Sequence, residues 1–251
     1  MPTPPMRVPF GLTQVPSFWP LGEIGQPDPA FYATYFDDFT QYVPASYTAS
    51  VTGTGAVARV AGKGGLVTLT TNATTPLVTD YVSLQEGVAG FQLTLGLKLA
   101  YSVSITAADY LNPGFVFGLI NTTATPFTAI TDGIWIASPS GSNLISLNHA
   151  VGSVLTTVAV PVGTFSLVNN QTYNLTFALR YNGEIIVNAS TSQSGQVYDQ
   201  DRVNIGPLAR ITPATLTTAF LNPTVGVLSG TATSKVLTVD WQYAAMERVA
   251  A

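Results

Sequence analysis

The sequence predicts an all-β protein, an antiparallel β-sandwich or jelly roll, and three observations carry this prediction. Short runs rich in Val, Thr, Leu, Ile and Tyr recur between Gly, Asn, Pro and Asp residues from residue 31 onward. Several of these runs alternate apolar and polar residues, which places the two kinds on opposite faces of a strand. No stretch of about ten residues shows the 3.6-residue period of an amphipathic helix. We therefore expect roughly ten or more strands in a single domain, residues 31–251.

The strands are most clearly predicted where the alternation is regular. Residues 91–99 place five apolar side chains on one face, and residues 173–181 do the same. Asn182 and Gly183 follow the second run, and this dipeptide favours a tight hairpin in which both turn positions have positive φ. Its partner strand is then 184–189. Further strands are predicted at 67–70, 114–120, 133–137, 154–160 and 236–243, and segments 80–87 and 107–111 are candidates for one helical turn each.

Residues 1–30 are predicted to form an extended arm outside the sandwich. They contain eight of the 17 prolines of the chain, which excludes a helix or a central strand. Large apolar residues stand between the prolines, whereas disordered linkers are depleted in such residues. We expect the arm to dock on a partner; the alternative is an arm that wraps over its own domain. The residues predicted to make these contacts are Phe10, Leu12, Phe18, Trp19 and Leu21.

Composition excludes several classes of function. Nine Lys and Arg against 13 Asp and Glu provide no cluster of cations for binding nucleic acid. The absence of Cys excludes disulfides, thiolate metal sites and cysteine nucleophiles. No apolar run approaches the roughly 18–20 residues of a membrane-spanning helix, and the first residues do not resemble a secretory signal. A surface that is polar without being charged favours a component of an assembly.

No residue pattern predicts a catalytic, metal or cofactor site. His149 is the only histidine, so it cannot form a His-based zinc site, and we expect it at the surface. Asp37 and Asp38 are adjacent and would point to opposite faces of a strand, so they cannot flank one glycosidic bond. We expect both to accept backbone N–H groups in a turn. Asp199 and Asp201 lack the Gly and Glu that a calcium-binding EF-hand loop requires.

Two tryptophans are candidates for carbohydrate binding, because sugars stack on aromatic ring faces. Trp135 and Trp241 both lie within predicted strands. An aromatic residue that alternates along a strand usually packs in the core or between sheets. The sequence therefore leaves two interpretations open for each of them, a sugar platform or a packing residue.

The order of these elements resembles a known group of proteins. Residues 36–39 open the first strand, and 64–71, 91–99, 115–120, 173–188 and 236–243 follow. In this order they resemble the concanavalin A-like (lectin/laminin-G type) sandwich proteins encoded among the structural genes of tailed bacteriophages. The resemblance implies a virion component, most like a capsid decoration or cement protein. The Glu-x-Asp-x-x-Glu strand of glycoside hydrolases with this sandwich is absent, and the metal-binding loop of the lectins is not recognisable.

Three functions follow as hypotheses. The first is a non-enzymatic protein that decorates the phage head, whose partners are the major capsid protein and copies of itself in a trimer. Such a protein is made in the host cytoplasm and resides in the virion. The alternative is a carbohydrate-binding or receptor-binding tail protein with a glycan ligand. The third is a polysaccharide-degrading enzyme that uses acids such as Asp37 and Glu86.

Overall fold

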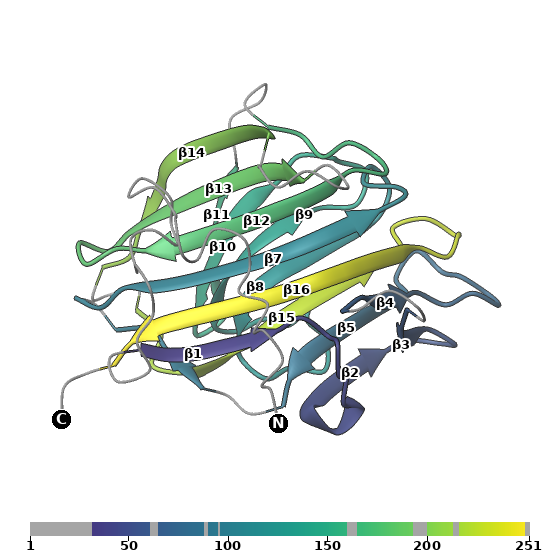
Figure 1. The fold of residues 1–251 in the computed structure, drawn as a ribbon, viewed down its shortest axis with the longest axis horizontal. Coiled ribbons are helices and arrows are strands. Elements are labelled where there is room, and N and C mark those ends of the chain that lie inside the picture. The colour runs from purple at the N-terminus through teal and green to yellow at the C-terminus, as the bar shows by residue number, and fades with distance from the viewer. Residues whose placement is uncertain are drawn as a thin grey trace, which may run out of the picture.

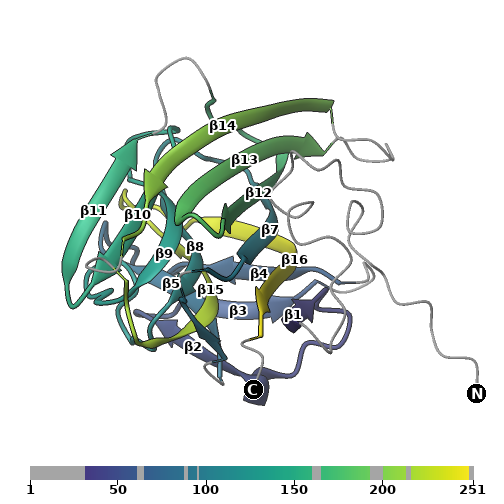
Figure 2. The ribbon, with the colours of Figure 1, turned by 90° about the vertical axis from the view of Figure 1, so that its left-hand side faces the viewer.

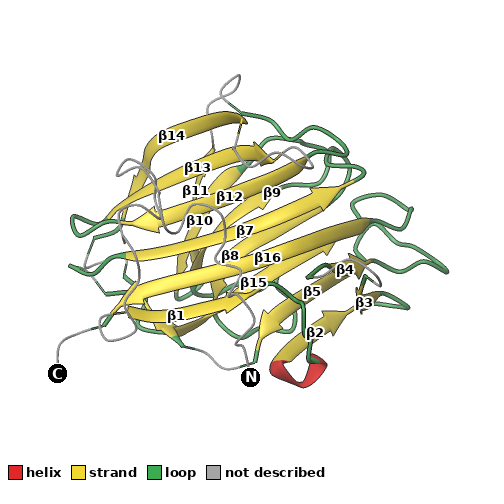
Figure 3. Cartoon of the chain, in the orientation of Figure 1, coloured by secondary structure: helices red, strands yellow, loops and turns green. Residues whose placement is uncertain are grey.

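The computed structural model describes residues 32–60, 65–87, 90–94, 96–159, 165–192, 200–212 and 216–248. Two antiparallel β-sheets stack face to face, which confirms the predicted all-β sandwich (Figures 1 and 3). The predicted arm, with Phe10, Leu12, Phe18, Trp19 and Leu21, lies outside the described residues. A short 3-10 helix, η1 (Pro44–Ser46), precedes the second strand.

The sheet that faces the viewer in Figure 1 is here called sheet A. Its spatial order is β14 (Gln200–Arg210), β13 (Glu184–Ser192), β12 (Thr172–Leu179), β7 (Leu99–Ala107), β16 (Val236–Glu247), β4 (Val67–Thr70) and β3 (Ala56–Arg59). The strand β1 (Tyr32–Asp37) also pairs with β16. A bulge between Val239 and Trp241 shifts the register of β16 against β7.

The second sheet, sheet B, lies behind sheet A in Figure 1 and beside it in Figure 2. Its spatial order is β11 (Val154–Ala159), β10 (Ser146–Val151), β9 (Gly133–Ser138), β8 (Gly114–Ile120), β15 (Phe220–Leu228), β5 (Tyr81–Glu86) and β2 (Tyr47–Val51). The short strand β6 (Phe91–Gln92) pairs with the beginning of β15. Strands β8 to β11 follow one another in the chain and in space, as an antiparallel meander.

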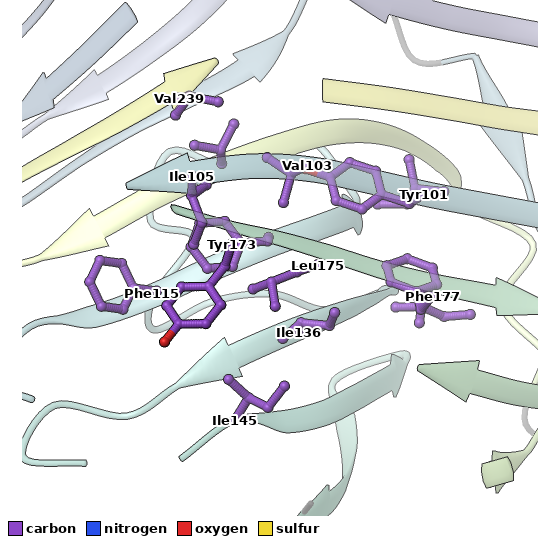
Figure 4. Close-up of a cluster of buried hydrophobic side chains, with 14 of the residues drawn as sticks. Tyr101, Val103, Ile105, Phe115, Ile136, Ile145, Tyr173, Leu175, Phe177 and Val239 are labelled. Atoms are coloured by element: carbon purple, nitrogen blue, oxygen red, sulfur yellow. The ribbon is translucent and has the colours of Figure 1, made fainter. Parts of the chain in front are cut away.

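The hydrophobic core fills the space between the two sheets (Figure 4). Tyr101 and Phe177, from neighbouring strands of sheet A, stack with their ring centroids 5.5 Å apart. Sheet B contributes Phe115 and Phe117, whose rings are also stacked. Each such side chain, once removed from water, contributes on the order of 1.5–3 kcal/mol to folding. The alternation predicted from the sequence therefore directs these residues inward and leaves the other face of each sheet for other contacts.

The structure corrects one predicted strand and one predicted helical turn. Residues 91–99 do not form one strand, because the backbone turns at Gly96, where φ is +84°. Phe91 pairs in sheet B, whereas Leu99 begins β7 in sheet A, so the run crosses from one sheet to the other. Segment 80–87 contains strand β5 and no helical turn.

The predicted hairpin after β12 is present, but its turn differs. The amide of Gly183 donates to the carbonyl of Arg180 at 2.9 Å, and the amide of Arg180 donates to the carbonyl of Glu184 at 2.9 Å. Gly183 has φ of +82°, whereas Asn182 is not among the residues with positive φ. The turn is therefore longer than the predicted two-residue turn, and β12 ends at Leu179.

Candidate functional site

The outer face of sheet B carries Trp135. The alternation along β9 points Ile134 and Ile136 into the core and Trp135 outward. Gly118 of β8 is its cross-strand partner, and a Cβ atom at Gly118 would lie 2.5 Å from the Cα atom of Trp135. The missing side chain of Gly118 thus leaves room for the Cα and Cβ atoms of Trp135. Val116 and other neighbours enclose it, so Trp135 is only 6% exposed.

The connection between β8 and β9, residues 121–132, folds back over this face. Phe127 packs against the cluster around Trp135, and its ring centroid lies 5.8 Å from that of Tyr81. The hydroxyl of Tyr81 donates to the carbonyl oxygen of Ala124 at 2.7 Å. The side-chain oxygen of Asn121 accepts from the amides of Thr131 and Asp132, both at 3.2 Å. These contacts hold the loop in place at both ends.

An open cleft of about 480 Å³ lies between this loop and strands β10 and β11. Its apolar lining includes Phe127, Trp135 and Leu155. Its polar lining includes Asn148 and Thr157, which face each other across β10 and β11. The hydroxyl of Thr157 donates to the side-chain oxygen of Asn148 at 2.7 Å. An aromatic surface therefore stands beside amide and hydroxyl groups in one concave site.

The described lining of the cleft carries no formal charge. None of the described residues that line it is Asp, Glu, Lys, Arg or His. Any ligand would meet the rings, methyl groups, hydroxyls and the amide of the lining, and no titrating group among them. The site is thus suited to a neutral, amphiphilic molecule.

Asp37 and Glu86, the acids named for the enzymatic hypothesis, do not line the cleft. Asp37 ends β1, and its carboxylate accepts hydrogen bonds from the amide of Phe39 at 2.6 Å and from the hydroxyl of Tyr47. Asp38 accepts from the amide of Thr40 at 3.1 Å, so the predicted role of both acids in a turn is confirmed. Burial raises the pKa of Asp37. Asp37 is engaged in holding the backbone and the Tyr47 side chain.

The second candidate tryptophan lies on the other sheet. Trp241 is half-buried on the outer face of sheet A, where it packs against a cluster that includes Ala100 and Tyr243. The structure therefore does not bring it together with Trp135. His149 lies within β10 and is 7% exposed, so the prediction of a surface histidine is wrong. Strand β10 is not among the strands predicted from the sequence, and it is the alternation along this strand that buries His149.

Of the described residues that line the cleft, sequence reasoning found Trp135 but not, among others, Phe127, Asn148, Leu155 and Thr157. Among the described residues, no group of three or more His, Asp or Glu side chains is placed to hold a metal ion. Within the described part of the chain, no helix is long and apolar enough to cross a membrane.

The two-sheet architecture has counterparts among solved structures. The lectin UEA-II in complex with galactose shares it over 86% of this chain and 99% of its own, with 11% identity and a TM-score of 0.58. The fold is concanavalin A-like. The Bacillus licheniformis β-glucanase matches with 12% identity and a TM-score of 0.51, covering 87% of this chain and 99% of its own.

A phage protein shares the same fold. The CBM2 module of the evolved Dit protein of Lactobacillus casei BL23 phage J-1 matches over 88% of this chain and 98% of its own, with 11% identity and a TM-score of 0.53. No protein-family model and no curated protein sequence matches this chain. The resemblance inferred from the sequence is therefore confirmed for the fold.

Proposed function

We propose that this protein binds carbohydrate without cleaving it, and that the cleft beside Trp135 and Phe127 holds a neutral glycan. The observation that carries this proposal is the composition of the cleft. Sugars present C–H faces that pack on aromatic rings, and hydroxyls that pair with amides and hydroxyls. Half-buried Phe127 supplies the first kind of surface, together with the small exposed part of Trp135. Exposed Thr157 supplies the second, together with the small exposed part of Asn148. The absence of charge in the described lining favours a neutral sugar over a uronic or sialic acid.

Binding is favoured over hydrolysis by the same lining. Most glycosidases need two carboxyl groups roughly 5–10 Å apart on either side of the scissile bond. The described lining of the cleft contains no carboxyl group. The carboxylate of Asp37 lies elsewhere and accepts a hydrogen bond from the amide of Phe39 in the turn after β1. The structural neighbours share only their fold with this protein. That fold is found in a lectin and a phage CBM2 module as well as in a glucanase.

A role in a phage tail or fibre agrees with this proposal, since such proteins recognise receptors on the host surface. Capsid decoration was predicted from the arm and from the resemblance to phage proteins. No observation on the described residues favours it, so decoration, with the major capsid protein as partner and a trimer as assembly, stays a prediction. The carbohydrate-binding alternative is the function that the cleft supports better.

The test is a screen of the full-length protein on an array of neutral and acidic glycans, followed by calorimetry with the strongest neutral ligand. Leu155→Ala is the variant to compare, because Leu155 lines the cleft and is 57% exposed. Val154→Ala is the matched control: Val154 is its neighbour on β11, 72% exposed, and not part of the lining.

Loss of the Leu155 side chain removes an apolar contact of about 1–2 kcal/mol, so we expect affinity to fall about tenfold. Val154→Ala should bind as the wild type does. Binding restricted to acidic glycans, no binding at all, or equal effects of the two substitutions would each contradict the proposal.

A further inference from the structure

One edge of sheet B is open in the described structure. Strand β11 pairs with β10, and no other described strand pairs with its opposite edge. In Figure 2, β11 forms the left-hand margin of the ribbon, away from the strands of sheet A. Two apolar side chains on it are largely exposed, Val154 at 72% and Leu155 at 57%. A strand with an open edge and exposed apolar side chains is ready to pair with a strand of another chain.

Strand β11 lacks the features that usually keep an edge strand from pairing. Natural proteins protect such edges with charged residues, prolines and bulges. None of the six residues of β11 is charged or a proline, and its register against β10 has no shift. The edges of sheet A differ, because β3 ends in Arg59 and the register of β14 against β13 shifts several times. Edge pairing is therefore open to β11 in a way that it is not to these strands.

The hairpin that ends in β11 is anchored to the rest of sheet B. Its turn consists of Gly152 and Ser153, with φ of +53° and +72°, which is typical of a tight two-residue hairpin. The amide of Gly152 donates to the carboxylate of Asp132 at 3.1 Å, and the amide of Ser153 donates to the carbonyl of Thr131 at 2.8 Å. Because the strand is already ordered, pairing with it costs little conformational entropy.

The order of side chains along β11 is complementary to itself. Residues 154–158 read Val-Leu-Thr-Thr-Val. If two copies pair antiparallel about a two-fold axis at Thr156, perpendicular to the sheet, Thr156 faces its own counterpart. Val154 then faces the partner's Val158, and Leu155 faces the partner's Thr157. Pairs of β-branched residues and pairs of threonines stabilise antiparallel strands, and no like charges meet.

We propose that a second copy of this chain pairs with β11 in this way, so that sheet B continues from one copy into the other. The two-fold axis closes the assembly at a dimer, because each copy uses its open β11 edge once. Leu155 and Thr157 line the cleft, whereas Thr156 between them points to the opposite face of the sheet. The axis is perpendicular to the sheet, so both clefts open on the same face of the dimer.

The test of the dimer is sedimentation velocity on the full chain over a series of concentrations, where we expect a reversible equilibrium between monomer and dimer. Thr156→Lys places two ammonium groups opposite each other at the axis and should weaken dimerisation at least about tenfold. Thr48→Lys is the matched control, because Thr48 is an exposed threonine on β2, at the opposite edge of sheet B. It should form dimers as the wild type does.

A charge-reversal experiment tests the position of the axis. Thr156→Glu alone should also be monomeric, whereas an equal mixture of Thr156→Lys and Thr156→Glu should form a heterodimer, because opposite charges then face each other. A wild type that is monomeric at every concentration, an equal loss in Thr48→Lys, or a mixture that stays monomeric would each overturn the proposal.

A cysteine substitution provides a second test if the charged variants do not fold. The chain contains no cysteine, so Thr156→Cys introduces a single thiol at the axis. Under mild oxidation we expect a disulfide-linked dimer from Thr156→Cys and little from Thr48→Cys. Equal yields from the two variants would overturn the proposal.

A consequence for ligand binding rests on the proposed carbohydrate binding, whereas the dimer itself does not. Two clefts on one face can engage a densely coated surface together. On a surface coated with the strongest neutral ligand from the glycan array, Thr156→Lys should dissociate about tenfold faster than the wild type, with unchanged affinity for the same ligand in solution. Equal dissociation would show that the clefts do not act together. If no glycan binds, carbohydrate binding fails and the sedimentation experiments still decide on the dimer.

Discussion

Tyr101 of β7 donates a hydrogen bond to the main-chain carbonyl oxygen of Thr224 in β15, at 3.2 Å, and so links the two sheets through the core. Both residues are fully buried. A second link runs from Gln242 of β16, whose amide nitrogen donates to the hydroxyl of Tyr35 at 3.0 Å. The hydroxyl of Tyr35 lies 2.8 Å from that of Tyr47, in sheet B. Polar contacts between strands thus join the two sheets at these two places, among core side chains that are mostly apolar.

The link through Tyr101 predicts a measurable loss of stability in Tyr101→Phe. The substitution keeps the ring and its stacking on Phe177 but leaves the carbonyl of Thr224 without this donor. We expect the free energy of unfolding to fall by about 1–3 kcal/mol in urea titrations. Tyr42→Phe is the control, because it also removes one tyrosine hydroxyl, but from a half-buried ring that packs on Tyr47. Equal losses in both variants would contradict the importance of the link.

Burial favours the protonated form of the hydroxyls of Tyr101 and Tyr35. Desolvation raises the pKa of Tyr101 well above its ordinary value, and the same cause raises the pKa of Tyr35. Both hydroxyls therefore keep their protons in mildly alkaline solution, and the links between the sheets persist there.

The sequence predicted strands well where local alternation decides the structure. Strand β8 spans Gly114–Ile120, as predicted, because Phe115, Phe117 and Leu119 alternate with residues of the other face. The run 91–99 has an equally regular pattern, yet Gly96 bends it and its two ends join different sheets. Alternation specifies which side chains point the same way, but it does not specify the sheet in which they pair.

The candidate site was only partly predictable for the same reason. Trp135 was recognised from its residue type, and its neighbours in the cleft come from distant parts of the chain. Phe127 lies in a loop, and Leu155 lies on an edge strand of the sheet. Their proximity depends on how residues 121–132 fold back over sheet B. No local pattern in the sequence predicts the course of this loop.

The pairing of Gly118 with Trp135 predicts that Gly118→Ala damages both stability and the cleft. A Cβ atom at Gly118 would lie 2.4 Å from the carbonyl oxygen of Ile134, and this backbone atom cannot move aside without distorting the strand pair. We expect a loss of about 1–3 kcal/mol in the free energy of unfolding, with a shift in tryptophan fluorescence as the indole is displaced.

Gly114→Ala is the matched control, because Gly114 lies on the same strand and the same face. Its nearest contact would be the end of the flexible Leu228 side chain, 3.3 Å away, so a small loss is expected. If the two substitutions cost the same and neither changes the fluorescence, Gly118 does not provide the space for Trp135.

An ion pair ties the loop after β7 to the beginning of β16. The ammonium group of Lys235 lies 2.7 Å from a carboxylate oxygen of Asp109. The same carboxylate accepts hydrogen bonds from the side-chain amide of Asn112 at 2.8 Å and from the amide of Leu111 at 3.0 Å. Desolvation alone would raise the pKa of Asp109, but the bonds from Lys235 and Asn112 outweigh it and lower the pKa to about 2.

The lowered pKa of Asp109 predicts how Asp109→Asn responds to acid. The ionised carboxylate stabilises the fold above its usual pKa of 3.8, and this contribution is lost as the pH falls from about 4 towards 2. Solvent screens the pair, so at pH 6 we expect the wild type to be more stable than the variant by about 0.2–1 kcal/mol. Urea titrations at a series of pH values should show the two curves converging near pH 2. A difference that stays constant between pH 6 and pH 2 would mean that the charge of Asp109 contributes nothing and that only its shape matters.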